Sequence, residues 1–159
     1  MLKKFFKKKE EMTWAVPLTG TIKSITDAPD PVFAQKIMGD GFCVEPTLGK
    51  IWSPVKGEII SIFPTKHAIG IKADNGYEIL IHFGIDTVNL NGEGFELHVK
   101  TGDRVEAGDL LLDIDIDSIK DRIPSTITAV VITNLEEKTV KLSKLGQARQ
   151  GDVITLDIN

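Results

Sequence analysis

Two of the three histidines in the chain, His67 and His82, lie in neighbouring apolar segments that a short Asp-Asn-Gly stretch separates. Asn-Gly favours the positive φ angles of tight hairpin turns, so the pattern predicts two antiparallel strands joined near residues 74–76. Neighbouring side chains on one face of such a hairpin have Cβ atoms about 5–8 Å apart. The sequence therefore predicts that the two imidazoles lie close together on one face of a sheet.

The register of this hairpin depends on the length of its loop. If Asn75-Gly76 forms a two-residue loop, His67 pairs with Gly84 and lies diagonally from His82. If the loop has four residues, His67 faces His82 directly, whereas a three-residue loop with a bulge would upset the relation. Both of the first two registers place three aliphatic side chains on the face of the histidines, namely Ile69, Ile71 and Leu80.

Two adjacent imidazoles suit either metal binding or phosphoryl transfer. Zinc takes four ligands, or three and a water, and only Asp86 lies near enough in sequence to join the two histidines. A phosphohistidine needs a neutral ring whose second nitrogen is held, and a donor for the phosphoryl oxygens. A second imidazole can be that donor, and Thr65 is well placed to orient His67. Thr65, His67 and His82 together therefore meet the requirements of phosphoryl transfer.

The rest of the sequence predicts an all-β sandwich or barrel, because short β-branched segments alternate with Gly, Pro and Asp. Two short helical turns are expected, one from Asp30 as N-cap to Gly39 and one over residues 115–124. The expected strands cover residues 13–16, 20–25, 41–44, 51–52, 57–63, 68–73, 78–83, 96–99, 110–115, 127–132, 139–142 and 153–157.

Composition and charge limit the possible surroundings of the protein. The 159 residues suffice for one domain with a core, and no apolar stretch is long enough to span a membrane. No secretory signal is present, and the single cysteine, Cys43, is expected to be buried in a cytoplasmic protein. The net charge of −4 divides into +3 for residues 1–11 and −7 for the rest. An acidic body argues against nucleic acid and suits a basic protein partner.

We expect residues 1–12 to be a basic tail and residues 13–159 to form the folded domain. The tail is either disordered or amphipathic, because Leu2, Phe5 and Phe6 recur at helical spacing among lysines. So short a helix would need a surface on which to fold. Residues 1–9 are therefore a candidate for peripheral attachment to the inner face of the membrane.

Four segments of the chain resemble the glucose-type enzyme IIA component of the bacterial phosphoenolpyruvate-dependent sugar phosphotransferase system. These segments are PVFAQKIMGDGF, TKHAIGI, IHFGIDTV and NGEGF, and the similarity covers roughly residues 13–158. The resemblance implies a compact antiparallel β-sandwich, related to the barrel-sandwich hybrid fold, with one or two short helical turns. It also implies a cytoplasmic phosphocarrier that is a separate subunit and a monomer.

The resemblance assigns a role to each residue of the histidine pair and its surroundings. The histidine of IHFGID, here His82, would accept a phosphoryl group on Nε2 from the phosphohistidine carrier protein. It would then pass the group to the enzyme IIB domain of a permease for a glucose-type sugar. His67 would contact the phosphoryl group, Thr65 would hydrogen-bond to His67, and the Gly84 carbonyl would hold the Nδ1 proton of His82.

The same resemblance implies a docking face for both partners. Asp30 and Asp86 would flank the site and meet basic residues of the carrier protein. An apolar collar would exclude the water that would otherwise hydrolyse the phosphohistidine. We expect Phe63 and Leu80, in particular, to be exposed. The candidates for the collar are Val32, Phe33, Met38, Phe63 and Leu80.

No cofactor is required for this chemistry, although zinc is a second possibility. In some relatives the two histidines complete a zinc site with a carboxylate of a partner, so His67 and His82 are candidate zinc ligands. The alternative function is a metal-binding or regulatory β-domain whose histidines are not phosphorylated. His98, in the segment FELHVK, has no comparable neighbours in sequence and is expected to be a structural or surface residue.

Two other classes of protein are disfavoured. A lipoyl or biotinyl carrier would need a modified lysine at a hairpin tip, and the expected tip here is ADNGY. A zinc peptidase of the lysostaphin type would need a His-x-His motif, which the sequence does not contain.

Overall fold

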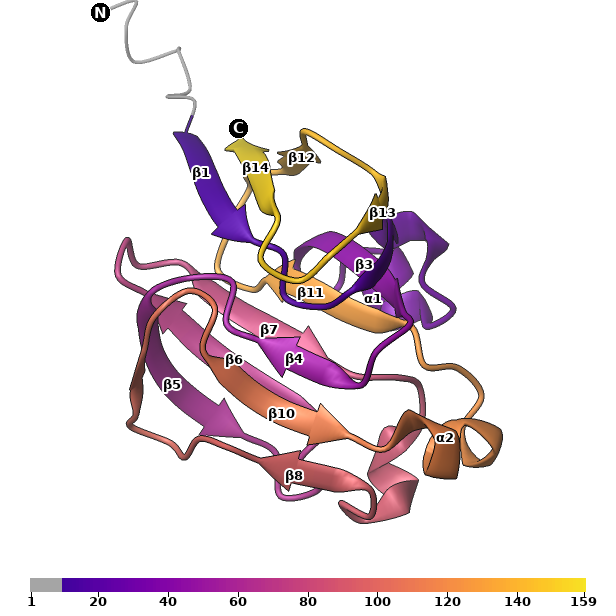
Figure 1. Cartoon of the computed structure of the whole chain (residues 1–159). Helices are drawn as coiled ribbons and strands as arrows, with labels where there is room; N and C mark the ends of the chain where they lie inside the picture. Colours follow the sequence, from indigo (N-terminus) through magenta and orange to yellow (C-terminus); the bar gives the residue numbers. More distant parts are fainter. Residues whose placement is uncertain (1–9) are drawn as a thin grey trace, which may run out of the picture.

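Antiparallel strands are the main secondary structure of the computed structural model, which describes residues 10–159 (Figure 1). The strands are β1 (Glu10–Ala15), β2 (Gly20–Ser24), β3 (Asp40–Pro46), β4 (Lys50–Trp52), β5 (Gly57–Ile62), β6 (Ala68–Ala73), β7 (Glu78–His82), β8 (Phe95–Leu97), β9 (Arg104–Val105), β10 (Leu110–Ile114), β11 (Thr128–Ile132), β12 (Val140–Leu142), β13 (Gly146–Ala148) and β14 (Val153–Ile158). The helices are α1 (Pro31–Ala34) and α2 (Ile116–Ile119), with 3-10 turns η2 (Ile25–Asp27), η3 (Thr87–Leu90) and η4 (Lys120–Arg122).

The strands form three sheets. The largest has eight strands in the order β13-β2-β3-β11-β7-β6-β5-β9. The other two have three strands each, in the orders β1-β14-β12 and β4-β10-β8. Figure 1 shows the strands of the β4-β10-β8 sheet in front of β5, β6 and β7 of the large sheet. The predicted antiparallel β-sandwich with a few short helical turns is confirmed.

The main core lies between the large sheet and the two small ones. Trp14 and Leu156 from the β1-β14 pair, Leu112 from β10 and Ile71 from β6 are all fully or almost fully buried there. A second, smaller cluster lies on the other face of the large sheet, next to α1 and η2. We call it the outer cluster; it consists of Ile25, Ala28, Phe33, Cys43, Ala68, Leu80, Ala129 and Val131.

Burial on both faces explains the sequence of the central strand. Every residue of β11, with sequence TAVVI, is buried, because the main core covers one face and the outer cluster the other. Such a strand reads as a continuous apolar run rather than as an alternating one. Cys43 on the neighbouring β3 is fully buried, as the sequence predicts.

The two helices begin as expected, but the first is shorter than its sequence pattern. The Asp30 side chain caps α1 by accepting from the Val32 backbone N–H over 2.9 Å. The helix then ends at Ala34 and not near Gly39, since Lys36 has a left-handed backbone with φ of 60°. The second helical region, α2 with η4, ends before Pro124, as that proline predicts.

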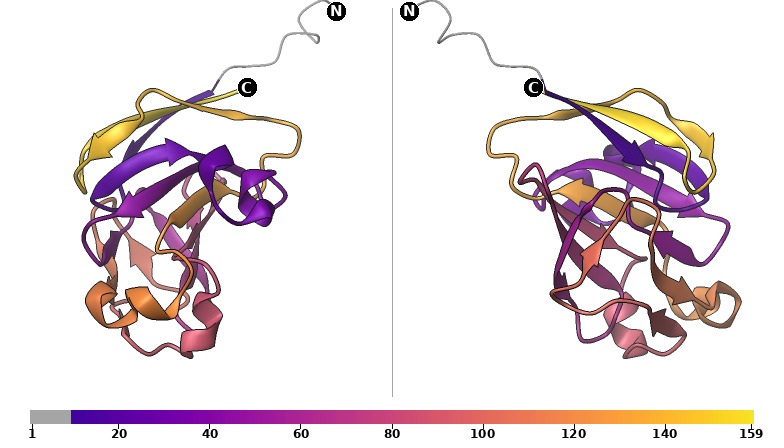
Figure 2. Two further views of the ribbon diagram at one scale, coloured as in Figure 1. Left: turned by 90° about the vertical axis from the view of Figure 1, so that its right-hand side faces the viewer. Right: turned by 60° about the vertical axis from the view of Figure 1, so that its left-hand side comes forward.

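The two ends of the described chain form one ladder. β1 begins at Glu10, so the expected folded domain starts three residues earlier than residue 13, and Glu10 pairs with Ile158. Both views in Figure 2 show β1 and β14 side by side at one end of the molecule. The proposed membrane-binding segment, residues 1–9, lies outside the described residues. No helix in residues 10–159 has the length and apolar character needed to cross a bilayer.

Two short strands lie outside the strand ranges expected above, although the two Gly-Asp turns of VKTGDRVEAGDLLLDI predict a very short strand at the position of β9. β9 and β13 have only two and three residues, so neither shows an alternating pattern long enough to recognise. Both lie at the edges of the large sheet, where they complete the pairing of β5 and β2. Neither strand carries a residue of the histidine site.

Candidate functional site

The histidine hairpin has the third of the three registers considered above, the one with a three-residue loop. β6 and β7 pair Ala68 with His82, so residues 74–76 form the loop. His67 therefore stands opposite Phe83, whose backbone N–H donates to the His67 carbonyl over 2.8 Å. Strict alternation along both strands would place the two histidines on opposite faces.

The two imidazoles nevertheless meet. Their ring centroids are 4.8 Å apart and their planes are nearly perpendicular, at 83°. The meeting is possible because His67 precedes the first residue of β6, and Lys66 before it has a left-handed backbone with φ of 65°. The chain bends there, so alternation does not govern where the His67 ring points. The predicted proximity is confirmed, although through a register that the prediction treated as unfavourable.

The three aliphatic residues expected beside the histidines are divided between the two faces of the sheet. Leu80 belongs to the outer cluster, together with Ala68, which pairs directly with His82. Ile69 and Ile71 instead belong to the main core. The expectation that all three share the face of the histidines is therefore wrong, because the actual register differs by one residue from both predicted ones.

His67 is a buried ring whose orientation Thr65 fixes. Its Nδ1 lies 2.7 Å from Thr65 Oγ1, as the resemblance implies, and the residue is only 4% exposed. Burial, with the nearby His82 as a second cause, lowers the pKa of His67 from 6.5 to about 4. The ring is therefore neutral at neutral pH. When the Thr65 hydroxyl donates to Nδ1, the single ring proton resides on Nε2, where it is free to donate.

His82 is half-buried, with one nitrogen inside the protein. Burial lowers the pKa of His82, and the Gly84 backbone and the charge of Asp30 oppose that effect. The Nδ1 atom is buried and, among the described residues, has no hydrogen-bond partner of good geometry. The Gly84 backbone thus favours a protonated Nδ1 without forming the well-aligned hydrogen bond that the resemblance implies. The Phe33 ring packs against the imidazole, with centroids 5.1 Å apart.

The predicted apolar collar divides into exposed and buried residues. Val32, Met38 and Phe63 are each between 38% and 39% exposed, and the Phe63 ring meets His67 edge-on at 5.4 Å between centroids. Leu80 is buried, so its predicted exposure is wrong: it packs in the outer cluster. Phe33 is buried in the same cluster and supports the ring of His82 instead of facing solvent.

Two further exposed aliphatic residues were absent from the predicted collar. Ile37 follows α1 directly before Met38, and Val88 lies in η3 after Asp86; both are exposed. Their signal in the sequence was weak, because an isolated aliphatic residue in a loop looks the same whether it is exposed or buried. Ile37 adds an exposed apolar side chain next to Met38, and Val88 adds one in η3.

The two predicted acidic residues differ in how they relate to His82. Asp30 caps α1, and its charge raises the pKa of His82. Asp86 has a left-handed backbone, with φ of 55°, and precedes η3 without capping it through its side chain. Asp30 thus favours the protonated form of His82 through its charge, whereas Asp86 lies in the loop that follows His82.

The lowered pKa of His67 predicts how stability depends on pH. The folded state resists protonation, so the free energy of unfolding should fall as pH decreases from the ordinary pKa of 6.5 toward the folded-state pKa of about 4. The maximal slope is about 1.4 kcal/mol per pH unit for one group. Urea denaturation at neutral pH and near pH 5 would measure it. His67→Gln should show the smaller loss, and an equal loss in both proteins would contradict the assignment.

Comparison with known proteins gives one consistent family. The family model described as "phosphoenolpyruvate-dependent sugar phosphotransferase system, EIIA 1" matches residues 12–138. A glucose-specific EIIA component of Bacillus cereus is 54% identical over 139 residues, which cover 86% of this chain and 84% of that protein. A component of the same description from Staphylococcus epidermidis is 42% identical over 163 residues, covering 99% and 98% of the two chains.

A solved structure has the same fold. The glucose permease IIA from Mycoplasma capricolum superposes with a TM-score of 0.87 at 39% identity, covering 92% of this chain and 96% of that one. The antiparallel β-sandwich that carries the histidine pair is thus the fold of a sugar-permease IIA component. The chain belongs to the EIIA 1 family of the phosphoenolpyruvate-dependent sugar phosphotransferase system. It is a phosphocarrier and phosphotransferase component of that system, and a histidine domain without phosphorylation is not favoured.

Proposed function

We propose that the chain accepts a phosphoryl group on Nε2 of His82 from the phosphohistidine carrier protein. It then donates the group to the enzyme IIB domain of a glucose permease. The observation that carries this assignment is the perpendicular pair of His67 and His82, with centroids 4.8 Å apart and both pKa values lowered. The choice of glucose is supported by the descriptions of the relatives, which are glucose-specific components.

A neutral His82 is the form that can act as a nucleophile. Its Nδ1 is buried, so Nε2 is the nitrogen that an incoming partner would meet. The Nε2 lone pair attacks phosphorus in line as the bond from phosphorus to the carrier's histidine nitrogen breaks, and that electron pair returns to the carrier's ring. In the donation step His82 is the leaving group: a nucleophile of the enzyme IIB domain attacks phosphorus, and the electron pair of the broken bond returns to Nε2 of His82.

His67 is suited to stabilise the phosphoryl oxygens. Thr65 can hold its Nδ1, which places the proton of the neutral ring on Nε2. A positioned N–H donor stabilises the negative charge on the oxygens of the transferring phosphoryl group. The low pKa of His67 keeps the ring in this form throughout the physiological range.

Both partners would dock on the exposed residues around the pair. Val32, Met38 and Phe63 supply apolar contact, and Ile37 extends it. Asp30 and Asp86 add negative charge, and the net charge of −7 outside residues 1–11 favours a basic partner. Displacement of water by such a partner protects the phosphohistidine from hydrolysis during transfer.

At the histidine pair, zinc binding is proposed only for a complex with a partner. His67 and His82 offer two ligands, and zinc requires at least a third from protein. Among residues 10–159 no carboxylate converges with this pair into a group of three candidate ligands.

We further propose that the protein is a cytoplasmic monomer that residues 1–9 attach reversibly to the inner face of the membrane. The support is the Leu-Phe-Phe pattern among five lysines.

The experiment that tests the function is intact-mass spectrometry. The full chain is incubated with phosphoenolpyruvate, enzyme I and the phosphohistidine carrier protein. One added phosphoryl group, lost on mild acid treatment, is the expected result, since a phosphoramidate bond is acid-labile whereas a phosphoserine ester is not. No added mass with competent upstream proteins would refute the proposal.

A separate prediction concerns the division of work within the pair. In His67→Gln the nucleophile is intact, so acceptance from the carrier protein should remain near that of the wild type. Donation to the enzyme IIB domain should fall, because the donor to the phosphoryl oxygens has been altered. Single-turnover transfer from the purified phosphoprotein measures this step, and normal donation would mean that His67 does not have this role.

A further inference from the structure

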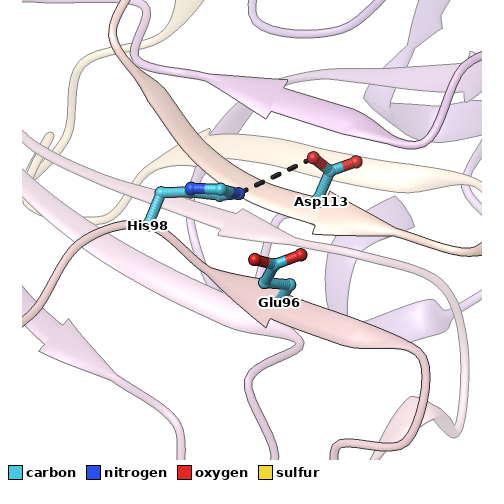
Figure 3. A group of neighbouring side chains, drawn as sticks. All are labelled: Glu96, His98 and Asp113. Carbon is cyan, nitrogen blue, oxygen red and sulfur yellow. Dashed lines mark ion pairs between the residues drawn. The ribbon is translucent and has the colours of Figure 1, made fainter.

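A second group of side chains with ligand character lies on the β4-β10-β8 sheet, which does not carry His82. Glu96 belongs to β8, His98 follows that strand, and Asp113 belongs to β10. Their candidate ligand atoms all lie within 4.8 Å of one another. Figure 3 shows the three side chains converging from the two strands. His98 is at the surface, as expected, but it has two acidic neighbours.

The strand register explains why the three meet. Glu96 pairs directly with Asp113 in the antiparallel ladder of β8 and β10. His98 lies two residues beyond Glu96, so its side chain returns to the same face, and its backbone N–H continues the ladder by donating to the Leu111 carbonyl over 2.9 Å. Regular strand geometry therefore holds the three side chains on one face, where Glu96 and His98 are exposed.

The charges in this group are not balanced. Two carboxylates directly opposite each other on a sheet repel, and such a pair is destabilising unless a cation lies between them. Lys50 forms an ion pair with Asp113, with Nζ 2.9 Å from Oδ2. Within the described part of the chain, no ion pair or hydrogen bond engages the carboxylate of Glu96. His98 Nε2 lies 3.6 Å from Asp113 Oδ2, which is too long for a good hydrogen bond.

We propose that Glu96, His98 and Asp113 form a binding site for a divalent transition metal such as Zn²⁺. One imidazole nitrogen and two carboxylate oxygens are a ligand set that zinc accepts, with water as the fourth ligand. The imidazole favours zinc, cobalt or nickel over magnesium and calcium, which prefer oxygen alone. The site is separate from the histidine pair and does not depend on the proposed function.

The distances allow this coordination after a small adjustment. Ligands about 2.1 Å from a tetrahedral zinc are about 3.4 Å from one another. The present separations of up to 4.8 Å must contract by roughly 1.4 Å, and rotation of exposed side chains can supply that. A surface hollow of about 430 Å³ adjoins the carboxylates and leaves room for water; its lining includes Glu96, Asp113 and Asp115.

Lys50 is the competitor that the metal must displace. Its ammonium group holds the same carboxylate oxygen, Asp113 Oδ2, that faces His98. The lysine side chain is 48% exposed, so it can leave the ion pair for water at little cost. Removal of this lysine should therefore tighten zinc binding severalfold, whereas loss of an actual ligand should weaken it.

Calorimetric titration with ZnCl₂ tests the site. We choose the full-length His82→Ala protein, because this change disables the other imidazole pair. One zinc per chain is the expected result. Addition of His98→Ala should lower the affinity about tenfold or more, a loss of at least about 1.4 kcal/mol. Absence of binding in His82→Ala, or equal affinity with and without His98, would overturn the proposal.

Two further variants test the remaining ligands in the same His82→Ala background. Glu96→Gln keeps the shape of the side chain but removes its charge, and it should weaken zinc binding. Lys50→Ala should strengthen binding, because Lys50 competes for Asp113, and weaker binding in this variant would overturn the three-residue site. Cobalt(II) gives a second readout, since ligation by His98 should produce absorption bands that disappear in His98→Ala.

Discussion

His82→Ala should abolish phosphorylation of the chain by the carrier protein. Alanine has no lone pair to attack phosphorus, and the neighbouring His67 cannot take over the role, because its residue is only 4% exposed and Thr65 engages its Nδ1. Intact-mass spectrometry should show the unmodified mass after incubation times that fully convert the wild type. Phosphorylation of this variant should be undetectable, and not merely slower than that of the wild type.

His98→Ala is the matched control for this result, since it removes an imidazole from the surface without touching the pair. It should be phosphorylated as fast as the wild type. If His82→Ala still gained an acid-labile phosphoryl group, another histidine would be the acceptor. Peptide mapping under alkaline conditions would then distinguish His67 from His98.

Gly84→Ala should strongly reduce both the stability of the protein and the rate of phosphorylation. Gly84 has φ of 70°, and a Cβ atom there would lie 2.7 Å from Thr87 Oγ1 and 2.9 Å from the Ser125 carbonyl. The left-handed backbone alone costs a non-glycine residue about 1–3 kcal/mol, and the collision adds to that. Since Gly84 follows His82 by two residues, any shift that relieves the collision also moves the ring.

Gly76→Ala separates the effect of the left-handed backbone from the effect of the Cβ collision. Gly76 has φ of 96°, but nothing lies within 4 Å of the position of its added Cβ atom. The Gly76→Ala protein should therefore lose stability through the backbone alone and should be phosphorylated at the rate of the wild type. Urea denaturation and single-turnover phosphorylation of both variants measure the difference. Equal losses in the two proteins would mean that the close contacts of Gly84 do not position His82.

The sequence was sufficient to predict the histidine pair but not its register. Asn75-Gly76 correctly indicates a turn, yet this dipeptide suits loops of several lengths, and one residue more or fewer moves every side chain to the other face. The proximity of the rings survived this error because His67 lies outside β6, after the left-handed Lys66. A non-glycine residue with positive φ cannot be recognised from residue type alone.

Burial was harder to predict than strand position. Leu80 and Phe33 belong to segments that match the family's docking face, and the expected exposure of Leu80 followed from that match. The outer cluster covers both, because α1 and η2 fold over this face of the large sheet. Whether a helix covers a strand depends on contacts between distant segments, which the local pattern does not report.

The Glu96, His98 and Asp113 group illustrates the same limit. The spacing of Glu96 and His98 places both on one face of the expected strand, but the sequence does not indicate the third residue, because only the pairing of β8 with β10 brings Asp113 to Glu96. Both strands are short, and their alternation in sequence gives their faces but not their neighbours. A group of ligands built across a sheet therefore becomes visible only when the strand order is known.

The ladder between β1 and β14 constrains when this protein can finish folding. Glu10 pairs with Ile158, so β1, the first strand of the described domain, must wait for β14, the last. Until residue 158 has left the ribosome, Met12 and Trp14 lack the β14 side chains that help to bury them. Contacts between segments so far apart in the sequence favour slow folding. The partly synthesised domain therefore exposes an apolar edge, and its main core can be completed only after β14 has left the ribosome.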